Sequence, residues 1–218
     1  MTAFDPGALP ALPTALLSDA LDRIGRPGSL LGVAPLANGQ RTMGPAYTVR
    51  YVAAGHPPGT VGDYLDDIPP GSVVVLDNSG RLDCTVWGDI LTAVAHQRGV
   101  GGTVIDGVNR DVHRALETGY PIWSRGRFMR TGKDRVQVEA VNGPVNIGEA
   151  RVDAGDLLRG DADGVVVIPR NHEDAVLAAA EEIDAVEQRI RAAINEGQTL
   201  AEARRALGYH QLQTRRQR

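Results

Sequence analysis

The chain of 218 residues has few of the features that define secreted, membrane or disulfide-stabilised proteins. Its single cysteine, Cys84, excludes an intrachain disulfide and a cysteine-cluster metal site, and it fits a reducing compartment. No stretch approaches the roughly 18 consecutive apolar residues of a membrane helix, and no basic region followed by an apolar run begins the chain. We therefore expect a cytoplasmic protein that does not enter a membrane.

The chain also lacks an excess of positive charge. It has 23 Lys and Arg against 27 Asp and Glu, a formal net charge of −4, which argues against a nucleic-acid partner. The tail over 197–218 is locally basic, and there a solvated chain end is a simpler interpretation than a partner-binding segment. Hydrophobic residues make up 42% of the sequence, enough to bury one sizeable core, so we expect a single domain over 1–218.

Motifs for common cofactors and catalytic groups are missing as well. The five histidines are scattered without a zinc-type pair, and the glycines at 99, 101 and 102 follow a predicted helix and precede a strand, the reverse of a nucleotide-binding loop. No nucleotide cofactor is expected. Cys84 has no activating histidine beside it in sequence, so a small buried hydrophobe is favoured over a nucleophile.

Alternating segment types predict a mixed α/β fold. Apolar residues at helical spacing predict a first helix that starts at Pro13 or Thr14 and ends at Gly25, and a long charged helix that runs from an Asn171 N-cap to about Asn195. Its narrow apolar stripe comprises Ala178, Ile183, Val186 and Ile190. Strands are predicted over 46–52, 72–77, 103–106, 121–124, 136–141 and 164–168, and the wholly apolar last one is expected at the centre of a sheet.

The most informative segment joins two acids and an arginine near the middle of the chain. Asp89 opens a predicted helix, and twenty residues separate it from the pair Arg110-Asp111, which opens the next helix after the strand over 103–106. Helix N-termini present free N–H groups and positive potential, so they attract anions and favour Asp. Each acid alone is an ordinary cap or turn residue. Together they predict a site for a small anion and a hard divalent cation, Mg²⁺ or Mn²⁺, rather than zinc.

At these residues the chain resembles the RraA-like family, which includes the 4-hydroxy-4-methyl-2-oxoglutarate/4-carboxy-4-hydroxy-2-oxoadipate aldolases and regulators of ribonuclease activity. The spacing between Asp89 and Arg110-Asp111 matches the aldolase motif. Further matching segments lie at 17–21, 44–49, 70–77, 87–91, 101–107 and 161–169. The resemblance implies a layered α/β sandwich with a central β core of the swivelling β/β/α type, extended by a C-terminal helix over 171–196.

The resemblance also implies a role for each site residue. Asp111 would bind the cation directly, Asp89 would orient a water on it, and Arg110 would contact the keto oxygen of a 2-oxo acid substrate. Gly88, Ile90 and Leu91 would bind the substrate, with the backbone amides of Ile90 and Leu91 receiving its carboxylate. Glu187 from a neighbouring subunit would approach the cation through water, which requires a homotrimer or a dimer of trimers.

The implied activity is cleavage of a 4-hydroxy-2-oxo acid to pyruvate through an enolate, with oxaloacetate decarboxylation at the same site. Arg125 and Arg127 are candidates for binding a second substrate carboxylate, although basic surface loops are common. Two alternatives stay open: a non-enzymatic regulator that binds a ribonuclease or another protein, and a lyase for a sugar-derived 2-oxo acid.

Overall fold

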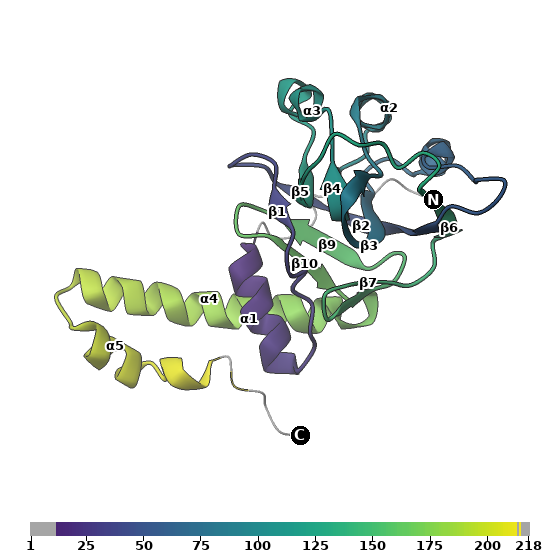
Figure 1. Cartoon of the computed structure of the whole chain (residues 1–218). Coiled ribbons are helices and arrows are strands. Elements are labelled where there is room, and N and C mark those ends of the chain that lie inside the picture. Colours follow the sequence, from purple (N-terminus) through teal and green to yellow (C-terminus); the bar gives the residue numbers. More distant parts are fainter. Residues whose placement is uncertain (1–11, 213, 215–218) are drawn as a thin grey trace.

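The computed structural model describes residues 12–212 and 214, and it confirms a mixed α/β fold (Figure 1). The helices are α1 (Thr14–Ile24), α2 (Asp89–Gln97), α3 (Val112–Thr118), α4 (Glu173–Asn195) and α5 (Leu200–Ala206), with 3₁₀ helices η2 (Asp63–Asp67), η3 (Arg170–His172) and η4 (Tyr209–Gln211). The strands are β1 (Ala34–Pro35), β2 (Thr42–Ala53), β3 (Val73–Thr85), β4 (Gly102–Asn109), β5 (Ile122–Arg127), β6 (Val136–Val141), β7 (Val145–Ile147), β8 (Ala150–Val152), β9 (Leu157–Gly160) and β10 (Val165–Ile168).

One strongly curved sheet forms the centre of the fold. Its order is β1-β5-β4-β3-β2-β9-β10, and β2 through β5 are parallel neighbours. The long strand β2 bends from one part of the sheet to the other: its first residues pair with β9, its middle with β3 and its end with β6. The hairpin of β7 and β8 forms a separate small sheet. Helices α2 and α3 lie on one side of this core, and α1 and α4 lie on the other (Figure 1).

Three apolar clusters fill the spaces between these layers. The first joins α2, α3 and η2 to the outer face of the parallel strands, with Trp87 and Leu76 among its members. The second fills the interior enclosed by the curved sheet and the β7-β8 hairpin, around Trp123 and Val75. The third packs α1 and α4 against β9 and β10. Successive residues of a strand point to opposite faces of the sheet, so they belong to different clusters.

The prediction that the apolar segment over 164–168 is central to the sheet is wrong. Strand β10 ends the strand order, yet all four of its residues are buried. Val165 and Val167 enter the interior cluster, whereas Val166 and Ile168 pack against α1 and α4. A terminal strand covered on both faces has the same apolar pattern as a central one, so the sequence alone could not distinguish them.

The first helix agrees with its prediction, with Pro13 as N-cap and left-handed Gly25 as C-cap. The long helix ends at Asn195 as expected, but His172 rather than Asn171 is its N-cap, because residues 170–172 form a 3₁₀ turn. The buried face of this helix also differs from the predicted apolar stripe, because Ala178 is exposed and Val186 is half-buried. The buried residues of α4 are Val176, Ala179, Ala180, Ile183 and Ile190.

Much of the expected basic tail is helical. Helix α5 begins with a capping box in which Thr199 and Glu202 exchange side-chain and backbone hydrogen bonds, and its Ala203 is fully buried. Residues 200–206 are thus helical rather than frayed, although most of them are exposed as expected of a solvated end, and residues 213 and 215–218 of the tail lie outside the described residues. Within the described part of the chain, no helix is long and apolar enough to cross a membrane.

Candidate functional site

The predicted site residues lie where two neighbouring parallel strands end. Strand β3 leads through Val86 and Trp87 into Gly88 and α2, and β4 leads through Arg110 into Asp111 and α3. Asp89 is the first residue of α2, and Asp111 is the N-cap of α3. The carboxyl edge of a parallel sheet is the usual place for a ligand site, because the strand-to-helix loops converge there. The structure thus brings Asp89, Arg110 and Asp111 to one edge.

Buried hydrogen bonds hold the two strand-to-helix loops together. The Thr85 hydroxyl lies 2.8 Å from the carbonyl oxygen of Trp87 and 2.9 Å from that of Val108. The Arg110 N–H donates to the same Trp87 carbonyl at 3.0 Å, which fixes the start of the Arg110 side chain relative to α2. The Trp87 indole N–H donates to the Thr92 hydroxyl, which in turn donates to the Gly88 carbonyl, both at 2.9 Å. These contacts position the loops before any ligand binds.

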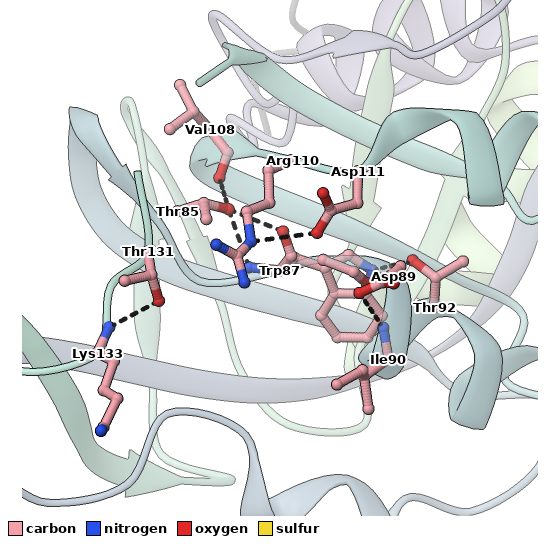
Figure 2. Close-up of polar contacts among 11 residues, drawn as sticks. Thr85, Trp87, Asp89, Ile90, Thr92, Val108, Arg110, Asp111, Thr131 and Lys133 are labelled. Atoms are coloured by element: carbon pink, nitrogen blue, oxygen red, sulfur yellow. Dashed lines mark hydrogen bonds and ion pairs between the residues drawn. The ribbon is translucent and has the colours of Figure 1, made fainter. Parts of the chain in front are cut away.

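Arg110 and Asp111 form an ion pair over the backbone of Gly88. The Arg110 Nε lies 3.2 Å from the Asp111 Oδ2, and the two side chains are 38% and 35% exposed, so the pair remains accessible to a ligand (Figure 2). A Cβ added at Gly88 would lie 2.9 Å from the Asp111 Oδ2 and 3.3 Å from the Arg110 Nε. Asp111 has a left-handed backbone, with φ of 54°. That conformation is costly for a residue other than glycine and is concentrated at functional sites.

An open pocket of about 510 Å³ adjoins this ion pair. Of the predicted site residues, it is lined by Gly88, Asp89, Ile90, Leu91 and Arg110. Asp111 is not among the lining residues and is adjacent through Arg110 and Gly88. The first residues of α2 therefore line the same cavity as Arg110, and a helix start beside an arginine is a combination suited to an anionic ligand.

The Ile90 amide already has an acceptor. Its N–H donates to the Asp89 Oδ1 at 2.8 Å (Figure 2), so a substrate carboxylate can receive this N–H only if the Asp89 side chain turns away. The Ile90 side chain is 73% exposed and lies between the pocket and a second one of about 490 Å³ that separates α2 from α3. His113 lines this second pocket, not the first.

Three of the polar residues that line the pocket lie far from the central motif and were not found from the sequence. Lys133 and Thr131 enter from the segment before β6, and Asp63 is the first residue of η2. Each lies in a segment without a recognisable motif, at least 20 positions from the central motif. Long-range pairing of β6 with β2 creates this wall of the pocket, and no local sequence signal reports that pairing.

Two arginines considered for a second substrate carboxylate have other partners. Arg125 is ion-paired with the buried Asp106, and Arg127 donates to the Leu36 carbonyl at 3.1 Å. Neither lines the pocket. The expectation that they bind substrate therefore finds no support in their position. Cys84 is fully buried, and that burial raises the pKa of its thiol, so it has the inert character expected of a small core residue.

The carboxylates of the site suit a hard cation that keeps several water ligands, rather than a cation coordinated entirely by protein side chains. Among the described residues, no three His, Cys, Asp or Glu side chains gather in a group that could hold a metal. Mg²⁺ commonly uses one or two protein carboxylates and keeps several waters, which a half-exposed Asp111 can accommodate. Glu187 lies on α4, across the sheet from α2 and α3 (Figure 1), where it accepts from Arg191 at 3.2 Å. The single chain does not bring Glu187 to the site.

Comparisons with known proteins agree with this geometry. The chain is 34% identical over 185 residues to a protein of Halalkalibacterium halodurans provisionally named 4-hydroxy-4-methyl-2-oxoglutarate aldolase, covering 85% of this chain and 86% of that protein. It is 40% identical over 202 residues to protein DlpA of Legionella pneumophila, but it spans only 33% of that longer protein. The crystal structure of Streptomyces coelicolor RraAS2, described as an unusual member of the RNase ES inhibitor RraA family, matches with a TM-score of 0.78 at 27% identity, covering 88% of this chain and 98% of that one.

The match to a family model is broader than the central motif. It extends over residues 14–167, from the start of α1 almost to the end of β10, and it therefore contains the parallel sheet, both strand-to-helix loops and the pocket. The aldolase and RraA resemblance of the sequence is confirmed. The chain belongs to the RraA-like family, described as Aldolase/RraA.

Proposed function

We propose that this chain is a divalent-metal-dependent aldolase that cleaves a 4-hydroxy-2-oxo acid, of the 4-hydroxy-4-methyl-2-oxoglutarate or 4-carboxy-4-hydroxy-2-oxoadipate type, to pyruvate. The observation that carries the proposal is the Arg110-Asp111 pair, held over Gly88 at the mouth of the pocket. The homologue in Halalkalibacterium halodurans that bears an aldolase name adds support. The same site would decarboxylate oxaloacetate, because that reaction also produces the enolate of pyruvate.

Each residue of the site has a separate role in the proposed reaction. The Leu91 amide, joined by the Ile90 amide once the Asp89 side chain turns away from it, receives the substrate carboxylate beside Gly88. Arg110 faces the keto oxygen and stabilises the negative charge that develops there, because a fixed guanidinium needs no reorganisation as the bond breaks. Asp111 limits the directions in which Arg110 can point. A divalent cation held by Asp111, with Asp89 orienting its water, would supply Lewis-acid polarisation of the substrate when bound.

Pyruvate release tests this function. It is measured from oxaloacetate and from 4-hydroxy-4-methyl-2-oxoglutarate, with Mg²⁺ or Mn²⁺ and with EDTA, and the metal-only rate is subtracted. We expect metal-dependent release that Asp111→Ala abolishes and that Asp67→Ala retains, since Asp67 is an exposed carboxylate that lines neither pocket near the site. Release no faster than the metal-only control from either substrate would reject the proposal.

Glu187 and the oligomer form a linked proposal. A homotrimer or a dimer of trimers would bring Glu187 of one subunit toward Asp111 of the next, which the single chain does not do. We expect Glu187→Ala and Asp111→Ala each to be inactive alone. Co-expressed in one cell, they should regain part of the activity, because mixed trimers contain some intact sites. No recovery in mixed oligomers would assign both residues to one subunit or remove Glu187 from the site.

A protein-binding regulator is the second candidate, favoured by the likeness to RraAS2. Such a function does not require a cation at Asp111. The two candidates differ in their response to Asp111→Ala, which would leave binding to a ribonuclease unchanged and would abolish cleavage of the 2-oxo acid. A cytoplasmic location stays a prediction under either function.

A further inference from the structure

Strand β9 carries a charged residue at a position that its surroundings make apolar. All four residues of β9 are buried, and Arg159 is only 7% exposed. Arg159 pairs with Met43 of β2 on one side and with Val166 of β10 on the other. Both neighbours pack in the apolar layer between the sheet and helices α1 and α4 (Figure 1). Residues directly opposite each other in a sheet share a face, so the Arg159 side chain enters this layer.

The guanidinium of Arg159 has no partner in the described part of the chain. Its Nε is buried without a hydrogen bond, and Arg159 forms no ion pair with any described residue. Arg23 is buried to the same degree, at 6% exposed, but it is ion-paired with Glu182 between α1 and α4. A buried donor without an acceptor and a buried charge without a counterion both destabilise a fold. Arg159 is therefore placed to donate to an anion that comes from outside these residues.

A second arginine adds positive charge beside Arg159. Arg41 stands two positions before Met43, which pairs with Arg159, so the two arginines point to the same face of the sheet. Burial lowers the pKa of the Arg159 guanidinium, and the charge of Arg41 lowers it further. Arg41 is exposed and forms no ion pair with any residue that the structure describes. Two cationic groups therefore adjoin, one buried and one open to solvent.

The nearby carboxylate of Asp161 does not neutralise both arginines. Its Oδ2 accepts the Thr14 N–H at 2.8 Å, and its Oδ1 accepts the Thr14 hydroxyl at 2.6 Å and the Asp163 N–H at 3.0 Å. Thr14 is the first residue of α1, so these bonds direct Asp161 to the positive start of that helix. Asp161 acts on Arg159 only through space, by opposing the lowering of its pKa. The two guanidinium charges thus share one carboxylate that is already engaged.

These arginines lie far from the candidate active site. The Thr42 hydroxyl, next to Arg41 in sequence, donates at 2.9 Å to the Gly101 carbonyl, just before β4 begins. Arg110 follows the other end of β4. The two arginines therefore mark the opposite edge of the parallel sheet, and neither lines the pocket beside Arg110. An inference about them is independent of the proposed aldolase function.

We propose that Arg41 and Arg159 form a second anion site, which binds a phosphate group. A phosphate group carries a charge of about −1.5 to −2 and several acceptor oxygens, so it matches two guanidinium groups, whereas a carboxylate balances one. A guanidinium donates to such an oxyanion through two N–H groups at once, which gives the Arg159 Nε an acceptor. Free phosphate and a phosphate ester offer the same oxygens. The bound group would join the ends of β2 and β9 beneath α1, and it would stabilise the fold.

Calorimetry with inorganic phosphate in the presence of EDTA tests the site. Binding is measured for the unmodified chain and for Arg110→Ala, which removes the arginine of the candidate active site, and we expect both to bind phosphate. Arg41→Gln should weaken binding by about tenfold, because one charge-assisted contact is lost, and Arg159→Met should abolish it. Arg205→Gln is the matched control, since it changes the net charge equally on the distant helix α5 and should leave the affinity unchanged.

Thermal unfolding separates ligand binding from a purely structural role. At about 100 times its Kd, phosphate should raise the Tm of the unmodified chain by at least about 5 °C. Arg159→Met should show no such rise. Without phosphate this variant should be at least as stable as the unmodified chain, because a methionine beside Met43 and Val166 replaces a buried charge that has no partner.

The remaining outcomes identify the ligand or reject the site. Tighter binding of glycerol 3-phosphate than of inorganic phosphate would identify an ester as the ligand, and the reverse order would identify the free ion. Acetate that binds as tightly as phosphate would overturn the assignment to a phosphate group. The site itself would be rejected by an unmodified chain that binds no phosphate, or by equal binding to the unmodified chain, Arg41→Gln and Arg159→Met.

Discussion

The contact between Gly88 and the Arg110-Asp111 pair leads to the most direct test of the site. Gly88 has an extended backbone, with φ of −148°, so alanine is conformationally tolerated there and its only effect is steric. The new Cβ would lie 2.9 Å from the Asp111 Oδ2. Ordinary contact needs about 3.5 Å, so the carboxylate or the helix start must move by roughly half an ångström.

A displacement of that size should reduce activity far more than stability. Misplacement of a reacting group by about 1 Å costs about 100-fold in rate, so we expect Gly88→Ala to lower kcat/KM for pyruvate release by about 10-fold, or about 1.4 kcal/mol. Asp111 and Arg110 are only partly buried and can rotate, so the free energy of unfolding should fall by less than about 1 kcal/mol. This corresponds to a decrease in Tm of at most about 4 °C for a chain of this length.

The assay combines steady-state kinetics on a 4-hydroxy-2-oxo acid with thermal unfolding of the same preparations. Gly143→Ala is the matched control, since the added methyl would meet only the Ala140 Cβ, at an ordinary 3.8 Å, away from the pocket. We expect this variant to retain full activity. A Gly88→Ala chain with unchanged kcat/KM would refute the reasoning, because the ion pair would then tolerate displacement and could not be the positioned centre of the site.

Three further predictions concern the surrounding structure. Burial raises the pKa of Asp161, but hydrogen bonds from Thr14, at 2.8 and 2.6 Å, together with the Asp163 N–H and the charge of Arg159, outweigh it and leave the net pKa lowered. The stabilisation that the ionised Asp161 gives is present above about pH 4 and is lost as pH falls through the lowered pKa. Asp161→Ala should therefore lower the free energy of unfolding in urea by about 1–2 kcal/mol at neutral pH and by less near pH 3. An equal loss at both pH values would contradict this account. Trp87→Phe removes the indole donor to the buried Thr92 hydroxyl and should lower the free energy of unfolding by about 1 kcal/mol. Chemical denaturation would measure this loss, and an unchanged midpoint would contradict it. Burial and the raised thiol pKa should keep Cys84 unreactive toward a thiol reagent until the chain unfolds, so rapid labelling of the native protein would refute that account.

Local signals in the sequence determined the ends of most helices and the central motif. Gly25 and Gly119 adopt the left-handed C-cap conformations expected of glycine, and Asp89 and Asp111 stand at the starts of α2 and α3. These features depend on residues a few positions apart, so the chain specifies them before it folds. The spacing from Asp89 to Arg110 likewise spans one helix and one strand, which bring both loops to the same sheet edge.

Tertiary structure alone decided which distant residues complete the pocket. Asp63 and Lys133 reach it because β6 pairs with the end of β2 and because the 59–63 segment hydrogen-bonds to β6. The place of β10 and the distance of Glu187 from the site were decided in the same way, by how α1 and α4 pack on β9 and β10. Strand order and helix docking depend on contacts between residues far apart in the chain, whereas residue spacing reports only the structure of a few neighbouring turns.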